Sequence, residues 1–298
     1  MDGVLRGLLI CCIASPLVGC GSLPVISRPM NLEESFIFHP RRFSKPDLES
    51  DDGAYEEARF QAHGGPRLYG WFAESAEPQA VVLYCHGNAG NIASRRWVLR
   101  LFQNHLNTSV LLFDYRGFGK SEGTPSETGV LADARAARKW LAERTGVAES
   151  EIVLVGNSLG GGVAVDLASR DGARGLVLES TFTSLPDVAA CHTKILPFHK
   201  IMRYRMDSQR KIGNYHGPLL QTHGTADQLV PYPLGERLFE NANEPKTFIS
   251  VPGGGHTDKP SDEYISALKN FLNTLSVPDS AKLGHPHAET GKAKIQVP

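Results

Sequence analysis

The sequence predicts an α/β protein whose mostly parallel sheet is covered by helices on both faces. Three observations support this prediction. From residue 55 onward, short apolar segments alternate with helical ones; a glycine-rich turn joins one expected strand to the next helix; and polar residues follow several strands. Parallel strands need crossover connections, and strands buried on both faces are apolar throughout. With 298 residues, 41% of them hydrophobic, the chain can form one domain with a full core.

The expected elements follow one another in a regular order. An antiparallel hairpin comes first, with strands over 58–62 and 68–72 around the turn Gly64-Gly65-Pro66. Apolar, β-branched segments predict six further strands, over 80–84, 109–113, 152–155, 175–178, 218–222 and 246–251. Helical patterns occupy 92–105, 126–143, 159–169, 232–241 and 261–275. Thr124-Pro125-Ser126-Glu127 is typical of a helix start, with Thr124 as the cap and a glutamate three residues later.

The first 19 residues predict a signal peptide. They carry one basic residue and an apolar run over 7–18, which is too short to span a membrane but long enough for a signal-peptide core. The run ends in Leu17-Val18-Gly19-Cys20, which resembles the lipobox of bacterial lipoproteins. That resemblance implies that Cys20 becomes the lipidated mature N-terminus. A cleaved signal peptide without lipidation and an uncleaved anchor are the alternatives.

Lipidation at Cys20 would place the protein on a membrane of the bacterial cell envelope. Gly21 follows where an aspartate often marks inner-membrane retention, so we expect the outer membrane. Each buried CH₂ contributes ~0.8 kcal/mol, so several acyl chains would hold the protein there almost irreversibly. Residues 20–47 are then a tether and irregular lead-in, residues 48–276 the domain, and residues 277–298 a disordered tail.

Composition excludes several other classes of protein. A formal net charge of −1 gives no electrostatic footprint for nucleic acid. No metal-ligand spacing and no dinucleotide-binding fingerprint occur, so we expect neither a metal nor a cofactor. Gly117-Phe118-Gly119-Lys120-Ser121 is similar to the end of a phosphate-binding loop, but the required first glycine falls at Asp114, which rules that interpretation out.

Two cysteines, Cys85 and Cys191, lie outside the leader and the lipobox. A disulfide between them is conceivable in an oxidising compartment. However, Cys85 ends an apolar strand, where a small buried thiol is the more common role of cysteine. We therefore expect two free thiols.

The turn Gly156-Asn157-Ser158-Leu159-Gly160 supplies the candidate nucleophile. It joins the strand over 152–155 to the helix over 159–169. A serine on such a tight turn is exposed at the top of the sheet, and glycines two residues to either side prevent clashes. Because a serine hydroxyl is a poor nucleophile near neutral pH, Ser158 needs an imidazole to take its proton and a carboxylate to orient that imidazole.

Asp227 and His256 supply those two groups. Asp227 follows the strand over 218–222, and His256 follows the strand over 246–251. Carboxyl ends of parallel strands share one edge of a sheet, where sites of such proteins lie. The order serine, acid, histidine therefore predicts catalytic roles for Ser158, Asp227 and His256.

An acyl-transfer site also needs donors for the anion formed on attack. The backbone N–H of Leu159, at the start of its helix, is one candidate. The loop His86-Gly87-Asn88-Ala89-Gly90-Asn91 follows another strand, and Asn88 is our choice for the second backbone N–H. These two residues form the predicted oxyanion hole.

Other residues at strand ends remain alternatives. Glu179, and less strongly Asp114, could replace Asp227 as the acid. His86 and His223 could replace His256 as the base, although a structural role is the simpler interpretation of both. Asp114 and its neighbours more simply brace the site entrance.

Four motifs lie at the ends of expected strands. They are His86-Gly87-Asn88-Ala89-Gly90-Asn91, Asp114-Tyr115-Arg116-Gly117-Phe118-Gly119-Lys120-Ser121-Glu122-Gly123, Gly156-Asn157-Ser158-Leu159-Gly160-Gly161 and His223-Gly224-Thr225-Ala226-Asp227. Together they resemble the small α/β-hydrolase-domain serine hydrolases, the group related to fungal bud-emergence proteins and animal depalmitoylating enzymes. The resemblance covers about residues 36–275. It implies an α/β-hydrolase fold with an eight-stranded sheet and a triad of Ser158, Asp227 and His256.

The expected function is that of a membrane-tethered serine hydrolase that cleaves carboxylic esters or thioesters through an acyl-enzyme. A peptidase or amidase, or an acyltransferase, would use the same triad, and a non-catalytic lipoprotein binding module is the alternative of another class. Residues 183–217 lie where such folds insert a short lid, and they are apolar with a basic bias. This lid could line an acyl pocket and face anionic headgroups or phosphate-bearing substrates, or be an ordinary amphipathic cap.

Overall fold

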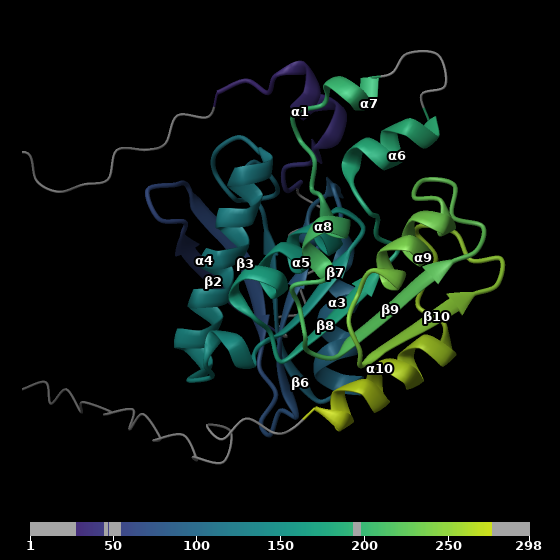
Figure 1. Ribbon diagram of the computed structural model, residues 1–298. Coiled ribbons are helices and arrows are strands. Elements are labelled where there is room, and N and C mark those ends of the chain that lie inside the picture. Colours follow the sequence, from purple (N-terminus) through teal and green to yellow (C-terminus); the bar gives the residue numbers. More distant parts are fainter. Residues whose placement is uncertain (1–27, 45–46, 48–54, 193–197, 276–298) are drawn as a thin grey trace, which may run out of the picture.

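An eight-stranded sheet forms the centre of the computed structural model, which describes residues 28–44, 47, 55–192 and 198–275 (Figure 1). Its strands are β2 (Glu56–Gln61), β3 (Arg67–Ala73), β4 (Ala80–Cys85), β6 (Thr108–Asp114), β7 (Val153–Asn157), β8 (Gly175–Glu179), β9 (Leu219–Gly224) and β10 (Lys246–Val251). They lie in the order β10-β9-β8-β7-β4-β6-β3-β2. β3 pairs antiparallel with β2 and with β6, and the other neighbours pair in parallel. The predicted fold class is confirmed.

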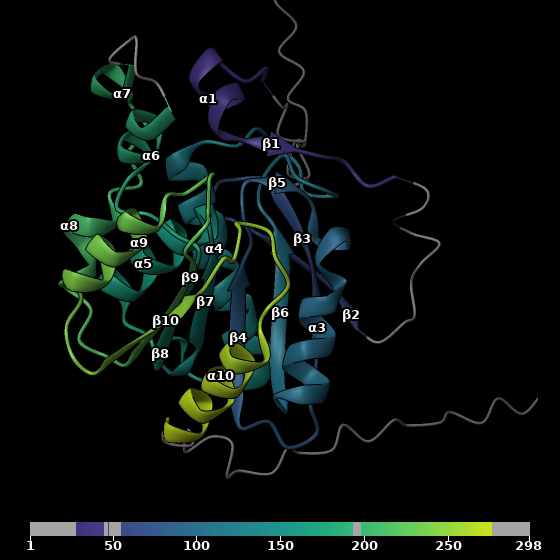
Figure 2. The ribbon, with the colours of Figure 1, turned by 90° about the vertical axis from the view of Figure 1, so that its right-hand side faces the viewer.

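Helices cover both faces of this sheet (Figure 2). On one face lie α4 (Glu127–Thr145), α5 (Leu159–Asp171), α8 (Ser208–Ile212) and α9 (Tyr232–Glu240). On the other lie α10 (Asp262–Thr274) and α3 (Arg96–Arg100), the latter between a 3₁₀ turn (Ile92–Arg95) and a π-helical turn (Leu101–His105). The remaining elements are α1 (Leu32–Ile37), α6 (Leu185–His192), α7 (Phe198–Ile201), a 3₁₀ turn (Glu149–Glu151) and the short strands β1 (His39–Pro40) and β5 (Ala89–Gly90).

Two apolar cores result, one on each face of the sheet. Leu83 and Leu154 contribute to the core under α4 and α5, whereas their neighbours Val82 and Val155 contribute to the core under α3 and α10. Side chains alternate between the faces of a strand, so a strand buried on both faces must be apolar at every position. This is why the central strands read as uninterrupted apolar runs.

The lead-in is more ordered than the sequence predicts. Asn31 caps α1: its side chain accepts the N–H of Glu34 at 2.9 Å, and Glu34 accepts the N–H of Asn31 at 2.8 Å. β1 then pairs in parallel with β5. The expectation of an irregular segment over 20–47 is therefore wrong for 31–40, because a six-residue helix and a two-residue strand leave no periodic signal. Residues 20–27 lie outside the described part of the chain.

The start of α4 also differs from the prediction. Ser126, rather than Thr124, is the cap, with an extended backbone (φ −155°, ψ 161°) and a side chain that accepts the N–H of Gly129 at 3.2 Å. The hydroxyl of Thr124 instead donates to the carbonyl of Arg28. Glu127 thus becomes the first helical residue, and it contacts the segment expected to form a lid.

That segment, residues 183–217, contains α6, α7 and α8 in its described parts; 193–197 lie outside them. Glu127 accepts the backbone N–H groups of Arg205 at 2.6 Å and Met206 at 3.0 Å, which fixes the stretch just before α8 to the start of α4. Glu33 of α1 accepts the N–H groups of Arg203 at 2.7 Å and Tyr204 at 2.9 Å. The lead-in and the expected lid therefore pack together at the top of Figure 1.

Cys85 and Cys191 are both free, as predicted, the first buried in β4 and the second exposed on α6. Within the described part of the chain, every helix is too short or too polar to cross a bilayer. Cys20 and the rest of the expected signal peptide, like the expected tail over 277–298, lie outside the described residues.

Candidate active site

Ser158 occupies the sharp turn between β7 and α5. Its backbone has φ +53° and ψ −117°, a conformation that non-glycine residues rarely adopt and that is typical of functional sites. A Cβ atom at Gly156 would clash with the backbone of Gly160, and one at Gly160 would clash with the carbonyl of Cys85. The two glycines therefore allow β7, α5 and the end of β4 to meet closely, and this holds the serine at the carboxyl edge of the sheet.

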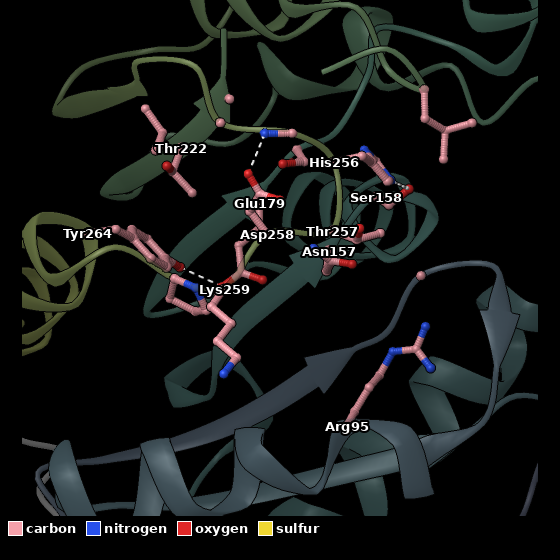
Figure 3. A pocket seen from close by; sticks show the side chains of 18 of the residues that line it. Arg95, Asn157, Ser158, Glu179, Thr222, His256, Thr257, Asp258, Lys259 and Tyr264 are labelled. Carbon is pink, nitrogen blue, oxygen red and sulfur yellow. Dashed lines mark hydrogen bonds between the residues drawn. The ribbon is translucent and has the colours of Figure 1, made fainter. Parts of the chain in front are cut away.

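The structure brings the three predicted side chains together. His256 Nε2 lies 3.0 Å from Ser158 Oγ (Figure 3). On the other side of the ring, His256 Nδ1 lies 2.7 Å from Asp227 Oδ2. Because a carboxylate only accepts, Nδ1 carries the proton, and Nε2 is left to accept from the serine hydroxyl. This arrangement provides a nucleophile, a base and an orienting acid in hydrogen-bonded series.

Asp227 is kept ionised by the groups around it. Burial favours the neutral acid, but hydrogen bonds from His223, His256 and the N–H of Val230 outweigh burial and hold the pKa of Asp227 well below its ordinary value. Asp227 Oδ1 accepts the N–H groups of Leu229 at 2.9 Å and Val230 at 2.8 Å. The carboxylate is therefore charged and fixed in orientation.

The alternative acids do not reach His256. Glu179 accepts hydrogen bonds from Tyr84 at 2.8 Å and Tyr264 at 2.6 Å, and burial raises its pKa. Asp114 is buried and accepts the N–H of Ile92 at 3.0 Å, and burial raises its pKa to about 8. The geometry therefore favours Asp227.

The alternative bases, His86 and His223, are buried, and each donates a hydrogen bond to a backbone carbonyl. His86 Nδ1 donates to the carbonyl of Gly87 at 2.6 Å, and burial lowers the pKa of His86 well below its ordinary value. His223 Nε2 donates to the carbonyl of Val230 at 2.8 Å and lies 3.3 Å from Asp227 Oδ2. Neither ring forms a hydrogen bond with Ser158 within the described residues.

The two predicted anion donors flank Ser158. Leu159 is the first residue of α5, where backbone N–H groups have no partner within the helix. Asn88 lines the same pocket as Ser158, and a Cβ on the preceding Gly87 would lie 3.4 Å from Ser158 Cβ. The loop that carries Asn88 thus passes directly over the serine.

Every carbonyl of that loop, residues 87–91, already accepts a hydrogen bond. The donors are His86 Nδ1 to Gly87, His39 N to Asn88, Arg95 Nη2 to Ala89, Arg41 N to Gly90, and Arg95 Nη1 to Asn91, at distances of 2.6–3.0 Å. The side-chain amide of Asn88 also donates to the carbonyl of Ile37 at 2.6 Å. The loop is therefore held by the lead-in and by Arg95, and these hydrogen bonds fix its position over Ser158 without a substrate.

A cavity of about 440 Å³ opens beside Ser158. It is bounded by the loop after β4, the 3₁₀ turn that follows, and the segment between β10 and α10. Sequence reasoning missed several of its lining residues, among them Tyr84, Arg95, Lys259 and Tyr264. The local sequence predicts only a strand at Tyr84 and a helix at Arg95, so no pattern marks either residue as part of a site. Only Lys259, three residues after His256, had a positional signal. No cluster of three His, Cys, Asp or Glu side chains suited to a metal occurs in the described residues.

Comparison with known proteins identifies relatives over most of the chain. A model of the alpha/beta hydrolase family matches residues 82–216. An uncharacterized protein of Mycobacterium tuberculosis is 38% identical over 274 residues, which cover 89% of this chain and 97% of that protein. Protein bem46 of Schizosaccharomyces pombe is 35% identical, with 70% of this chain and 73% of that protein covered. The alpha/beta hydrolase domain-containing protein WAV2 of Arabidopsis thaliana is 34% identical, with 68% and 73% covered.

Solved structures share the fold at lower identity. An esterase of Pyrococcus furiosus gives a TM-score of 0.64 at 21% identity and covers 80% of this chain and 98% of its own. An alpha-beta hydrolase of Vibrio vulnificus gives the same score and identity, with 85% and 95% covered. The solved structures share the fold, and the sequence relatives together with the family model show that the chain belongs to the alpha/beta hydrolase family.

Proposed function

We propose that this protein is a serine hydrolase that cleaves carboxylic esters or thioesters. The observation that carries the proposal is the position of His256, which lies 3.0 Å from the hydroxyl of Ser158 and 2.7 Å from the carboxylate of Asp227. Membership of a hydrolase family supports hydrolysis as the reaction class. One of the solved structures that share the fold is named an esterase, and this supports an ester bond as the target.

In the proposed reaction, Ser158 Oγ attacks the acyl carbon while its proton passes to His256 Nε2. Asp227 stabilises the imidazolium that forms. The backbone N–H groups of Leu159 and Asn88 stabilise the negative charge on the acyl oxygen. When the intermediate collapses, the bond to the alcohol or thiol breaks and His256 returns the proton to that leaving group. Water then attacks the acyl-enzyme by the same route and regenerates the serine.

A fluorophosphonate probe tests the nucleophile directly, because it forms a covalent bond with an activated serine. We expect one adduct on the full-length protein, located at Ser158 by mass spectrometry. Ser158→Ala should abolish labelling, whereas Ser35→Ala, which alters an exposed serine on α1, should not. Equal labelling of Ser158→Ala would refute the assignment.

We also propose that Cys20 is lipidated and anchors the protein to the outer membrane. The support is the sequence Leu17-Val18-Gly19-Cys20 at the end of the apolar leader. Expressed in a bacterium, Cys20→Ser should leave an unacylated precursor by intact mass, and the protein should leave the membrane fraction. Cys12→Ser, which changes a leader cysteine outside the lipobox, should be processed normally. Normal acylation of Cys20→Ser would overturn this proposal.

A further inference from the structure

The guanidinium of Arg95 lies beside the candidate active site, and no described carboxylate pairs with its positive charge. Arg95 ends the 3₁₀ turn after the loop carrying Asn88 and lines the pocket of Ser158. Its guanidinium donates to the carbonyls of Ala89 at 2.7 Å and Asn91 at 2.9 Å. Among the described residues, no carboxylate oxygen lies within 4.0 Å of it. A guanidinium has five N–H groups, and its contacts here with neutral acceptors leave its charge in place.

The buried acids around the pocket do not supply the missing negative charge. Asp114 interacts electrostatically with Arg95, but burial raises its pKa to about 8, so the acid is mostly protonated near neutral pH. Glu179 has both oxygens engaged by the hydroxyls of Tyr84 and Tyr264, and burial raises its pKa as well. Burial thus weakens the negative charge of both groups while the arginine keeps its own.

A second cation, Lys259, lines the same pocket from the segment after His256. Within the described residues it forms no ion pair, and its side chain is exposed. The neighbouring Asp258 is an acid of the pocket wall, and it accepts the N–H of Gly255 at 2.7 Å. In Figure 3, Arg95 extends from the helical segment below the site and Lys259 from the loop beside it.

We infer that this pocket contains a subsite for an anionic group, with Arg95 as its main determinant and Lys259 as an accessory cation. The substrate is then an ester or thioester that carries a carboxylate or phosphate in addition to the bond that is cleaved. The inference rests on the proposed function and names its substrate class. An arginine in a partly desolvated pocket binds such groups through short, charge-assisted hydrogen bonds.

Matched substrate pairs test the inference on both sides of the scissile bond. On the acyl side, the pair is 4-nitrophenyl hemiglutarate and its neutral methyl ester. On the leaving-group side, the pair is a 1-acylglycerol 3-phosphate and the corresponding 1-monoacylglycerol. We expect the anionic member of at least one pair to have a kcat/KM about tenfold or more higher, because a hydrogen bond to a charged group is worth that much. The pair that responds shows whether the anion is a carboxylate on the acyl group or a phosphate on the alcohol.

Substitution of Arg95 distinguishes recognition from loop positioning. Arg95→Gln removes the charge and should abolish the preference for the anionic member, whatever it does to turnover in general. Arg95→Lys should keep part of the preference, and Lys259→Gln should reduce it. Lys269→Gln, which removes an exposed charge from α10, should leave the ratio unchanged. If Arg95→Gln lowers kcat/KM equally for both members, Arg95 only positions the loop and the inference is wrong.

A binding measurement separates this inference from the proposed chemistry. Ser158→Ala cannot turn over the esters but keeps Arg95, so 4-nitrophenyl hemiglutarate should raise its melting temperature more than the methyl ester does. Equal shifts, together with no preference by the wild-type enzyme, would overturn the subsite. Absence of all ester turnover and probe labelling, with the unequal shifts retained, would instead reject the proposed function.

Discussion

At the residue scale, Asp227 is shared by two imidazoles of which only His256 reaches the serine. His223 is buried, and its proton on Nε2 lies between the carbonyl of Val230 and the carboxylate of Asp227. A Cβ on Gly235 would press against this ring, so α9 packs tightly behind it. His223 therefore holds the acid from behind, while His256 faces Ser158.

Replacing the acid should affect turnover more than folding. Asp227→Asn removes the charge that stabilises the His256 cation and the acceptor that fixes its tautomer, so we expect kcat for a 4-nitrophenyl ester to fall about 10³–10⁴-fold. Asp114→Asn is the matched control, because Asp114 is mostly protonated near neutral pH and forms no contact with His256. Steady-state kinetics of both variants provides the measurement, and comparable losses would contradict the choice of Asp227.

The sequence predicts Ser158, Asp227 and His256 because each follows a recognisable strand in the order that this fold uses. The position of Arg95 in the pocket, and the contact that His223 makes with Asp227 in addition to that of His256, could not be predicted in the same way. Their roles depend on the path of a loop and on packing between β9 and α9, neither of which leaves a local pattern. Sequence therefore predicts the candidate reacting groups, while their supports become visible only in three dimensions.

At the element scale, α1 is held against the expected lid by a buried acid. Glu34 contacts Arg28 and accepts a hydrogen bond from Tyr204 at 2.5 Å, while Phe38 packs edge-on against the ring of Tyr204 at 6.3 Å. Hydrogen bonding to Arg28, above all, lowers the pKa of Glu34 from 4.5 to about 2. The charged form of Glu34 therefore stabilises the docked helix.

The lowered pKa of Glu34 predicts that the docking of α1 depends on pH. Because the pKa is lower in the folded protein, the stabilisation is fully present above about pH 4.5 and is lost as the pH falls toward 2. We expect hydrogen exchange over residues 32–38 to accelerate between pH 4.5 and 2 beyond its intrinsic pH trend. Glu34→Gln should exchange faster at neutral pH and lose this extra dependence. Unchanged exchange in that variant would show that the acid does not hold α1.

The elements themselves were predictable to different degrees. The central strands and the long helices α4, α5, α9 and α10 are marked by apolar runs and helical periodicity, and they form where the sequence predicts them. Only the capping residue of α4 differs from the prediction, because Thr124 and Ser126 are both good caps and the hydroxyl of Thr124 instead donates to the carbonyl of Arg28, almost a hundred residues earlier. α1 is too short to leave a periodic pattern in the sequence. Because such a short helix is unstable alone, tertiary contacts must stabilise it.

At the scale of the whole molecule, the sheet carries the candidate reacting groups at the carboxyl ends of its strands. Leu154 is fully buried in β7, four residues before Ser158, and packs in the core under α4 and α5. Leu154→Ala should lower the free energy of unfolding by about 2–5 kcal/mol, because it removes buried apolar surface and leaves a cavity. Leu32→Ala, at a side chain that is 80% exposed, should change it by no more than about 0.5 kcal/mol. Urea unfolding of both variants measures the difference, and equal midpoints would contradict this account of the core.

The pairing of β1 with β5 has a mechanical consequence. Within the described residues, α1 and β1 connect Arg28 to the loop over Ser158, and Glu33 and Glu34 fix α1 to residues 203–204. A pull on the upstream chain must therefore detach α1 before it loads the hydrogen bonds between β1 and the loop. The short helix therefore takes up load on the preceding chain before that load reaches the loop over Ser158.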